Sequence, residues 1–535
     1  MGNDNKEQDV TDLRIGIDVG GTNTDAVLMC GRKVLATTKR STTQDVTGGV
    51  TNAIGDVLAL GNVAAASIGA VMVGTTHFVN AFVQRRELQP VAIVRIGLPM
   101  TSGIPPLVDW PDELREALGD HVFLVGGGSY YTGKDYAPLD QAALETAARE
   151  IQRRNLHAVA ISCVFAPIRP DLEIEARKII HSIAPDVHVT LSHQVGGMGL
   201  IERENAAVIN ASLHDLADKV VSALERAMGG MGLNANLFLT QNDGTLMATE
   251  VARQFPVTTC SAGPTNSIRG AAFLSDLQDA IVVDIGGTTT DVGVLSKGLA
   301  RETSDAFDLG GVRTNFSMPD VLSIGLGGGT IVRFDADGRV RLGPDSVGFK
   351  LSTEARVFGG ETLTTSDIAV SRGQLDLGDP ALVRDVLAAQ SDSVARTINA
   401  RVEATVDQLK TSAKDIPVIL VGGGSVLIDG DLAGASQVIR PENGTVANAI
   451  GAAIAQVGGR VKRLFNFGGE GGRDAAIAQA IEEAKAEALA AGAIAGSLEV
   501  VDIEEYPMPY MQTDAVDVRV RVVGDLDTKK LVCQS

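Results

Sequence analysis

Two stretches of the chain, residues 15–28 and 281–295, repeat one unusual pattern. Each is an apolar run, a centre of the form Gly-Gly-Thr-x-Thr-Asp, and a second apolar run. Superposing the copies pairs Asp18 with Asp284, Gly20 and Gly21 with Gly286 and Gly287, Thr22 with Thr288, Thr24 with Thr290, and Asp25 with Asp291. Two copies of one motif, each near the start of one half of the chain, predict two similar half-molecules.

The pattern of each copy predicts a β-hairpin, because short apolar runs flank a tight glycine-rich turn. Glycines at a hairpin tip let backbone N–H groups approach an anion closely, and threonine hydroxyls add further donors. We therefore predict that both tips cradle phosphate groups. The residues expected to do so are Gly20, Gly21, Thr22 and Thr24 in the first copy, and Gly286, Gly287, Thr288, Thr289 and Thr290 in the second.

The aspartate before each glycine pair cannot bind phosphate directly, since both groups are anionic. It can instead hold Mg²⁺, which bridges to phosphate oxygens. Asp18 and Asp284 are therefore the predicted metal-side residues. A single copy is equally well explained as an ordinary hairpin turn. A pair of acidic, threonine-rich loops is what clamping a nucleotide from two sides requires.

Length and composition set the fold class. A chain of 535 residues exceeds the usual size of a single core, so we expect two or three domains. Hydrophobic residues make up 44% of the chain but aromatic residues only 4%. The core must therefore be built from aliphatic side chains, as in sheets covered by helices. We predict an α/β fold.

Charge and cysteine usage exclude several classes of partner. The net charge of −20 opposes binding to nucleic acid or to anionic membranes. The four cysteines lack metal-type spacing, and we expect them to be reduced thiols. No apolar run approaches the ~20 residues of a membrane span, and the polar N-terminal segment has no signal-peptide core. We therefore expect a soluble, cytoplasmic protein.

Two further glycine-rich segments lie in the second half of the chain. Gly327 and Gly328 belong to a run that precedes a predicted hairpin. Gly422, Gly423, Gly424 and Ser425 follow directly after a predicted strand. Three consecutive glycines at the end of a strand indicate that the backbone approaches a flat ligand closely. We expect both segments to contribute to the nucleotide site.

Polar residues at two other places are candidate substrate contacts. Thr75, Thr76 and Asn80 follow a predicted strand, at the end where ligands of open α/β sheets usually lie. Glu202 and Arg203 precede a long predicted helix at the junction of the two halves. The threonines are equally well explained as a helix cap, and the charged pair as helix-start charges, so both interpretations stay open.

The duplicated loops resemble the two phosphate loops of the actin, sugar-kinase and Hsp70 superfamily of ATPases, whose two lobes close over Mg-ATP. In that superfamily the place of residues 422–425 is taken by the adenosine-binding loop. The resemblance implies a duplicated, two-lobed α/β fold of the ribonuclease H-like type. It implies a first lobe at residues 14–200, a second lobe at 201–458 and a small C-terminal α/β appendage at 459–535.

An ordered set of motifs between residues 14 and 455 is similar to the hydantoinase/oxoprolinase family, specifically its A-type subunit. The set comprises Gly74-Thr75-Thr76 with Asn80-Ala81, Glu202-Arg203 ahead of Asn210-Ala211, residues 261–264, the second phosphate loop, and the glycine run at 327–329 followed by residues 343–346. The resemblance implies ATP- and Mg²⁺-dependent hydrolysis of a cyclic amide of the hydantoin, 5-oxoproline or lactam type. It also implies a B-type partner subunit, a homo-oligomer or both.

In the implied reaction the γ-phosphoryl group of ATP is transferred to the amide carbonyl oxygen, and water then opens the ring. Asp25 or Asp291 would orient the water, and we rank Asp291 first because it sits in the second loop, near the expected γ-phosphate. Three alternatives stay open. They are the ATPase subunit of an acetone- or acetophenone-type carboxylase, a non-catalytic actin-like regulatory ATPase and, less favoured, a sugar kinase.

Overall fold

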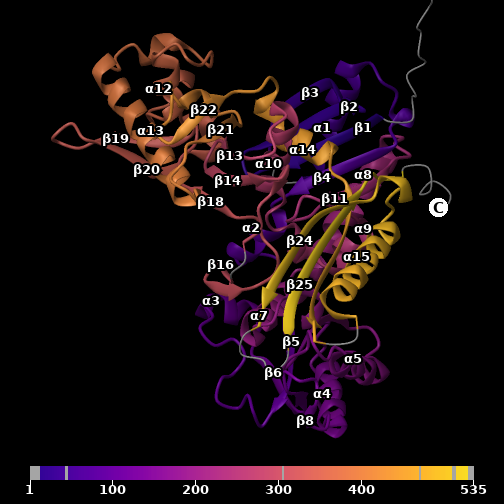
Figure 1. The fold of residues 1–535 in the computed structure, drawn as a ribbon. Helices are drawn as coiled ribbons and strands as arrows, with labels where there is room; N and C mark the ends of the chain where they lie inside the picture. The colour runs from indigo at the N-terminus through magenta and orange to yellow at the C-terminus, as the bar shows by residue number, and fades with distance from the viewer. Residues whose placement is uncertain (1–12, 43–45, 304–305, 469–470, 509–513, 528–535) are drawn as a thin grey trace, which may run out of the picture.

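The computed structural model of the protein describes residues 13–42, 46–303, 306–468, 471–508 and 514–527. Figure 1 shows two lobes beside one another at the top of the view and a smaller domain below the first lobe. The C-terminal strands, coloured yellow, run down the front of the molecule between the first lobe and the lower domain. Sheets covered by helices build all three parts, so the predicted α/β class and the two-lobed architecture are confirmed.

The first lobe is built on a nine-stranded sheet that contains the first predicted hairpin. Its strands lie in the order β24-β25-β23-β12-β11-β4-β1-β2-β3. β1 and β2 are antiparallel and place Asp18 opposite Asp25, while β4 lies parallel to β1 on its other side. The N-terminal strands are β1 (Leu13–Val19), β2 (Asn23–Cys30), β3 (Lys33–Ser41), β4 (Ala70–Thr75), β11 (Asn236–Thr240) and β12 (Leu246–Ala248).

The second lobe repeats this hairpin in a sheet of its own. β13 and β14 are antiparallel and place Asp284 opposite Asp291, and β21 lies parallel to β13. The sequence repeat is therefore a structural repeat with the same register. The strands of this sheet are β13 (Ala280–Ile285), β14 (Thr290–Ser296), β15 (Leu299–Ala300), β18 (Val321–Ile324), β21 (Ile416–Val421) and β22 (Ala435–Ile439).

Two helices pack against one another between the lobes, α10 (Ala262–Ser275) on the second-lobe sheet and α14 (Ala447–Ala453) on the first-lobe sheet. Their contact depends on glycine. A methyl group on Gly270 would lie 1.9 Å from the carbonyl oxygen of Ala447, and one on Gly451 would lie 1.9 Å from that of Asn266. Only a residue without a side chain permits this approach, so the two backbones touch directly.

The lower domain is a four-stranded parallel sheet in the order β10-β9-β5-β6. The apolar faces of α4 and α5 pack on it, and α7 and α8 connect it to the first lobe. These elements are β5 (Val91–Leu98), β6 (His121–Gly126), β9 (Ala158–Cys163), β10 (His188–Leu191), α4 (Gln141–Arg153), α5 (Asp171–Ile183), α7 (Leu200–Ser212) and α8 (His214–Gly230).

The division of the chain departs from the expected boundaries at 200/201 and 458/459. β11 and β12 follow residue 201 but pair into the first-lobe sheet. The C-terminal strands β23 (Val457–Asn466), β24 (Glu499–Pro507) and β25 (Ala515–Gly524) extend this same sheet instead of forming a separate appendage. The second lobe is thus inserted between β12 and β23. A strand pattern identifies a strand but not its sheet, because tertiary contacts choose the pairing partners.

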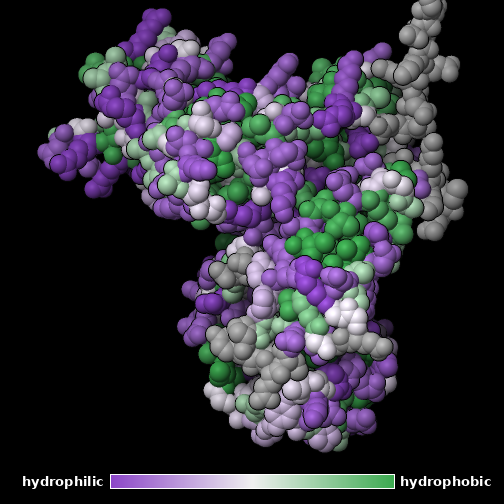
Figure 2. Space-filling view, viewed as in Figure 1, coloured by the Kyte–Doolittle hydropathy of each residue, from purple (hydrophilic) through white to green (hydrophobic). Residues whose placement is uncertain are grey.

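The outer part of the second lobe contains the hairpin predicted after the glycine run, formed by β19 (Thr330–Phe334) and β20 (Val340–Ser346). Helices α12 (Thr365–Ser371) and α13 (Ala388–Leu409) pack behind it. In the C-terminal region, α15 (Gly472–Ala490) packs a row of alanines on β23 and β25. Figure 2 shows a mainly hydrophilic second lobe and a hydrophobic area around the upper part of the C-terminal strands.

Within the described ranges, no helix combines the length and hydropathy needed to cross a membrane. Cys30, Cys163 and Cys260 are free thiols, the last two of them buried. Cys533 and the polar N-terminal segment lie outside the described residues.

Candidate nucleotide site

The two hairpin tips meet at the interface between the lobes. Thr22 Oγ1 lies 3.3 Å from Thr288 Oγ1, although the two residues are 266 positions apart in the sequence. The same backbone bond closes each tip: the N–H of Gly20 donates to Asn23 O at 3.0 Å, and the N–H of Gly286 donates to Thr289 O at 2.9 Å. The structure therefore brings the two predicted phosphate loops together, tip to tip.

Asp18 is buried beneath the first tip, and one of its oxygens has no partner. Asn448 Nδ2, from α14, donates to Asp18 Oδ2 at 2.9 Å, while Asp18 Oδ1 receives no hydrogen bond. Burial raises the pKa of Asp18 to about 7, and the charges of Asp25 and Asp284 add to this effect. A buried carboxylate oxygen without a donor is suited to hold a cation, because the cation supplies the missing partner.

Asp284 has corresponding surroundings in the second lobe. Ser267 Oγ, from α10, donates a hydrogen bond to Asp284 Oδ2. Burial raises the pKa of Asp284, and the bond from Ser267 partly offsets the rise. A methyl group on Gly422 would lie 2.2 Å from Asp284 Oδ1, so the triple-glycine loop also reaches this carboxylate. Each metal-side aspartate is thus held by the inter-lobe helix that packs on its own sheet.

The two candidate water-orienting residues, Asp25 and Asp291, lie in different environments. Asp25 is 3% exposed, and Lys39 Nζ pairs with its Oδ2 at 2.7 Å. Asp291 is partly exposed and accepts a hydrogen bond from Ser323 Oγ. Burial raises the pKa of Asp291 to about 6, with a contribution from the charge of Asp284. A partly exposed carboxylate suits a general base better than a buried one that is already paired with a lysine, so the geometry favours Asp291 over Asp25 as the candidate.

Thr24 and Thr290 are fully buried, and their hydroxyls are used within the protein. Thr290 Oγ1 donates to Leu326 O at 2.6 Å, and Thr24 Oγ1 lies 3.3 Å from Thr42 Oγ1. These two hydroxyls brace the hairpins instead of pointing to a ligand. The accessible hydroxyls at the tips are those of Thr22, Thr288 and Thr289.

The glycine run at 327–329 packs on the second tip. The N–H of Gly328 donates to Gly286 O at 3.0 Å, and the N–H of Gly329 donates to Gly287 O at 2.7 Å. A methyl group on Gly327 would lie 2.7 Å from the carbonyl carbon of Gly287. Gly327 and Gly328 are buried, so they hold the second phosphate loop in place from behind.

The triple-glycine loop leaves open space beside the second tip. Gly422 has φ +82°, a conformation that favours glycine, and the N–H of Gly424 donates to Ile285 O at 2.7 Å. Gly423 is exposed, and a methyl group there would meet no atom within 4 Å. Ser425 follows as the first residue of a short 3₁₀ turn. This arrangement fits the close approach of a flat ligand over Gly423.

Thr75, Thr76 and Asn80 lie beside Asp18. Asp18 pairs with Gly74 in the β1–β4 register, and a methyl group on Gly263 would contact both Asp18 Oδ1 and Thr76 Cγ2, at 3.6 and 3.5 Å. Thr75 Oγ1 accepts a hydrogen bond from the N–H of His77, the first residue of α2 (His77–Val83), while Thr76 occupies the N-cap position without a capping bond from its side chain. Thr76 and Asn80 keep accessible polar groups.

Glu202 and Arg203 separate into one accessible and one buried residue. Arg203 is 0% exposed and donates to Ser192 Oγ and to the carbonyl oxygens of Gly197 and Cys163. It therefore joins α7 to the lower domain. Glu202 is partly exposed, with its Oε1 3.4 Å from Arg313 Nε. Of the pair, only Glu202 remains available to a ligand.

Four side chains that were not predicted from the sequence hydrogen-bond the aspartates, namely Ser267, Asn448, Lys39 and Ser323. Asn448 is a lone amide in an alanine-rich helix, and that anomaly is a usable signal. Lys39 and Ser323 are ordinary polar residues of exposed strands, so nothing in their sequence context marks them.

Asp18, Asp25, Asp284 and Asp291 form an acidic cluster, which fits a divalent cation that is shared with phosphate oxygens. Its carboxylates repel one another, which contributes to the raised pKa of Asp18 and of Asp291, and a cation relieves this repulsion. Among the residues that the structure describes, no three carboxylate, histidine or cysteine side chains form a metal site on their own. Mg²⁺ needs no such site, because it keeps several waters and binds through one or two carboxylates together with substrate phosphates.

Comparison with known families gives two adjoining matches. The profile of the hydantoinase/oxoprolinase N-terminal region matches residues 14–184. The main hydantoinase/oxoprolinase profile matches residues 203–484, which is more than half of the chain.

Similar curated proteins include the caprolactamase alpha subunit of Pseudomonas jessenii, which is 27% identical over 392 residues, or 68% of this chain and 54% of that protein. The acetophenone carboxylase gamma subunit of Aromatoleum aromaticum is 26% identical over 401 residues, or 68% of this chain and 53% of that protein. The chain thus spans about half the length of the curated relatives it matches.

Two solved structures share the fold. The ATP-dependent caprolactamase of Pseudomonas jessenii superposes with a TM-score of 0.75 at 18% identity, covering 96% of this chain and 88% of that one. Nucleotide-free acetone carboxylase superposes with a TM-score of 0.68 at 18% identity and the same coverage. At this level of identity the likeness confirms the fold and leaves the substrate open.

Proposed function

The chain belongs to the hydantoinase/oxoprolinase family, and we propose that it hydrolyses a cyclic amide of the hydantoin, 5-oxoproline or lactam type with the consumption of ATP. The observation that carries the proposal is the meeting of the two phosphate loops, with Thr22 and Thr288 in contact and Asp18 and Asp284 behind them. A similar protein that is named a caprolactamase subunit supports a lactam-type substrate.

ATP is needed because an unstrained amide carbonyl is a poor electrophile. Transfer of the γ-phosphoryl group to the carbonyl oxygen gives a phosphorylated imidate and ADP. Water then adds to the activated carbon, and the carbon–nitrogen bond breaks, so that the ring opens to an amine and an acyl phosphate. A second water hydrolyses the acyl phosphate to the acid and phosphate. The chain need only position the reactants and stabilise charge, which is the usual task of a protein in phosphoryl transfer.

Each part of the site has a role in this reaction. The tip amides and the hydroxyls of Thr22, Thr288 and Thr289 bind phosphate oxygens, and the space over Gly423 takes the adenosine. Asp18 and Asp284 would hold Mg²⁺, which would neutralise negative charge on the phosphates. Asp291 accepts the proton of the attacking water, because it is accessible and its pKa lies near 6. Thr76, Asn80 and Glu202 are the remaining candidates for contact with the amide.

A partner subunit completes the proposal. Three of the similar curated proteins are named as alpha, gamma and beta subunits, and this chain spans about half of the length of each. We propose a B-type partner that takes part in ring opening, while the present chain binds ATP.

A second candidate function is the ATPase subunit of a ketone carboxylase. It is favoured by the likeness to the acetophenone carboxylase gamma subunit and to the acetone carboxylase beta subunit. In that case the activated carbonyl group belongs to a ketone or to bicarbonate, and the same two loops bind the phosphates of ATP.

The test is ATP turnover by the purified chain with Mg²⁺, alone and with its co-purifying partner. The compounds to add are hydantoin, 5-oxoproline, small lactams, and a ketone with bicarbonate. Stimulation by a cyclic amide, with formation of the ring-opened acid, supports the proposal, and stimulation only by ketone plus bicarbonate supports the second candidate. Absence of Mg-ATP binding by the wild-type protein contradicts both.

A further inference from the structure

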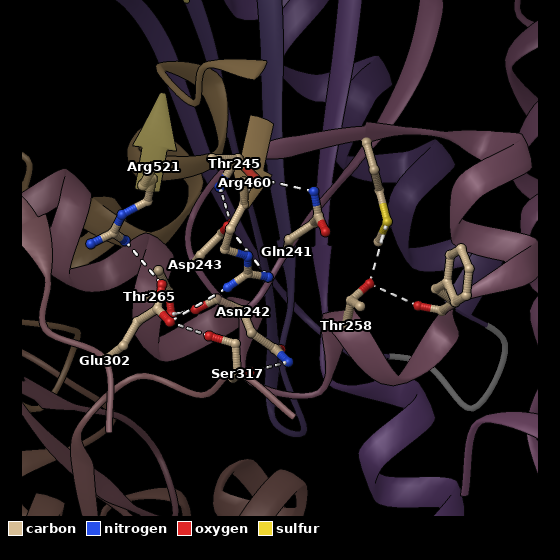
Figure 3. A network of polar contacts seen from close by, with 12 residues as sticks. Gln241, Asn242, Asp243, Thr245, Thr258, Thr265, Glu302, Ser317, Arg460 and Arg521 are labelled. Atoms are coloured by element: carbon tan, nitrogen blue, oxygen red, sulfur yellow. Dashed lines mark hydrogen bonds and ion pairs between the residues drawn. The ribbon is translucent and has the colours of Figure 1, made fainter. Parts of the chain in front are cut away.

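A polar network joins the C-terminal strands to helix α10 (Figure 3). At one end lies Glu302, which follows β15 in the second lobe. Arg460 Nη1, from β23, donates to Glu302 Oε2 at 3.4 Å, and Arg521 Nη1, from β25, donates to Glu302 Oε1 at 3.1 Å. One carboxylate of the second lobe thus binds two guanidinium groups of the C-terminal strands.

The two arginines are held side by side by the sheet register. Arg460 and Arg521 are direct partners in the antiparallel β23–β25 pair. Like charges opposite one another destabilise a sheet, so the pair needs an anion between them. Glu302 supplies it, and Asp243 adds a second carboxylate 4.0 Å from Arg460 Nη2. The place of these strands relative to the second lobe therefore depends on Glu302.

The network continues from Glu302 to the start of α10. Ser317 Oγ donates to Glu302 Oε2. Asn242, in the turn between β11 and β12, donates through Nδ2 to Ser317 O at 3.1 Å and accepts through Oδ1 from the N–H of Ser261 at 2.6 Å. Ser261 directly precedes the first residue of α10. Asn242 is 4% exposed, so water does not readily replace these bonds.

A second path runs through the turn that contains Asp243. A methyl group on Gly244, which has φ +81°, would lie 2.4 Å from Arg269 Cδ of α10. Arg269 is 7% exposed, and two of its nitrogens, Nε and Nη1, have no hydrogen-bond partner. The charge of Asp243 is the favourable interaction that offsets its burial. The turn therefore holds α10 from the side by packing and by charge.

The opposite side of the same helix faces the acidic cluster. Gly263, in its first turn, packs on Asp18, and Ser267, one turn later, donates to Asp284. The first two turns of α10 thus contact the network on one side and both metal-side aspartates on the other. A displacement of the helix start changes the surroundings of Asp18 and Asp284 together.

We propose that Glu302, Arg460 and Arg521 are positioning residues of the nucleotide site. Through Ser317 and Asn242 they set the start of α10 against Asp18 and Asp284, so the C-terminal strands adjust the site without touching the ligand. The inference rests on the proposed function only in taking the ligand to be Mg-ATP. The coupling between the strands and the helix holds for the free protein as well.

The test compares three variants of the full chain. Glu302→Gln removes the shared charge, and Ser317→Ala removes the next link while leaving the charges intact. Glu483→Gln is the matched control, because Glu483 pairs with Arg463 of β23 at 2.9 Å and takes no part in the network. Hydrogen–deuterium exchange of residues 261–268 is measured without nucleotide. The affinity for Mg-ATP is then measured by calorimetry and ATP turnover by phosphate release.

We expect exchange at residues 261–268 to rise about tenfold in Glu302→Gln and Ser317→Ala and to stay at the wild-type rate in Glu483→Gln, because local opening reports local contacts. We also expect kcat to fall about fivefold or more in the two network variants, with the Kd of Mg-ATP within about twofold of the wild type. Equal exchange at α10 in the network variants and the control overturns the inference. A rise of the same size throughout the protein does so too, because it reports general destabilisation. A wild-type chain that does not bind Mg-ATP contradicts the proposed function alone, since the exchange measurement needs no nucleotide.

Discussion

Gly270 of α10 and Gly451 of α14 make the same contact in opposite directions. Each lies where a methyl group would be 1.9 Å from a carbonyl oxygen of the other helix, that of Ala447 for Gly270 and that of Asn266 for Gly451. The two helices belong to different lobes, and Ser267 and Asn448 on them hold Asp284 and Asp18. This close backbone contact between the lobes is therefore built into the same helices that hold the two predicted metal-side aspartates.

Replacing Gly270 by alanine tests this contact. The added methyl group has no room, so we expect the free energy of unfolding to fall by about 2 kcal/mol or more, as for overpacked cores. Equilibrium urea denaturation followed by circular dichroism measures the loss. Gly451→Ala should behave alike, because its geometry is the same. A stability equal to that of the wild type in either variant would contradict the close contact.

Gly423 is the matched control, because a methyl group there meets no atom within 4 Å. We expect Gly423→Ala to leave the free energy of unfolding unchanged. If adenosine lies over this residue, the variant binds Mg-ATP about tenfold more weakly, because the methyl group occupies space that the ligand needs. Isothermal titration calorimetry measures the affinity. Unchanged affinity would place the adenosine elsewhere.

Asp284→Asn tests the metal-side role. Asparagine keeps the shape and can still accept the hydrogen bond of Ser267, but it removes the charge that Mg²⁺ requires. We expect ATP turnover to fall at least about 100-fold, the size of loss seen when one stabilising group is removed from a transition state. Phosphate release measures it, and Asp337→Asn, at an exposed hairpin turn, is the control. Turnover at the wild-type rate would exclude Asp284 from the site.

The pH dependence of stability tests the environment of Asp18. Its folded pKa is raised from 3.8 to about 7, so the folded state binds this proton more tightly than the unfolded state. The contribution of Asp18 to the free energy of unfolding is complete below pH 4 and falls by about 4 kcal/mol as the pH rises through 7. Asp18→Asn should not show this fall, because asparagine does not ionise. Without Mg²⁺, we expect its melting temperature to exceed that of the wild type at pH 8 and to equal it at pH 4.

Asp56 provides the control of opposite sign. Its hydrogen bond from Arg40 lowers its pKa, so this carboxylate stabilises the fold above its unfolded pKa and not below. Asp56→Asn should therefore have a melting temperature at pH 8 no higher than that of the wild type.

Addition of Mg²⁺ should narrow the difference in melting temperature between the wild type and Asp18→Asn, because the ion binds only the charged residue. If Asp18→Asn is less stable than the wild type at pH 8 without Mg²⁺, the raised pKa of Asp18 is contradicted.

The pH–rate profile tests Asp291 as the base. Because the pKa of Asp291 is raised to about 6, its ionised, proton-accepting form is lost as the pH falls through 6. We expect kcat/KM for the wild type to decline on the acid side with an apparent pKa near 6. Asp291→Asn should lower kcat by about 100-fold or more and remove this limb. A variant that keeps both the rate and the acid limb would assign the base to another residue.

The sequence alone predicts the two hairpins and their aspartate pairs, because alternating apolar runs around a glycine turn are local signals. The repeat also predicts that the two loops clamp one nucleotide, and the contact of Thr22 with Thr288 fits that prediction. The sequence pattern assigned the hydroxyls of Thr24 and Thr290 to phosphate, but both are buried and contact Thr42 and Leu326, which lie elsewhere in the chain. Lys39 and Ser323 were missed for the same reason.

The pairing of β23 with β12 has a consequence for the order of events during synthesis. The second lobe lies between these two strands in the sequence, so a ribosome must complete that lobe before β23 emerges. Until then β12 presents an open edge on the newly made first lobe, and open edges invite wrong partners. The edge of β12 is therefore open to wrong pairing while the second lobe is being made, and it is covered once β23 has been synthesised.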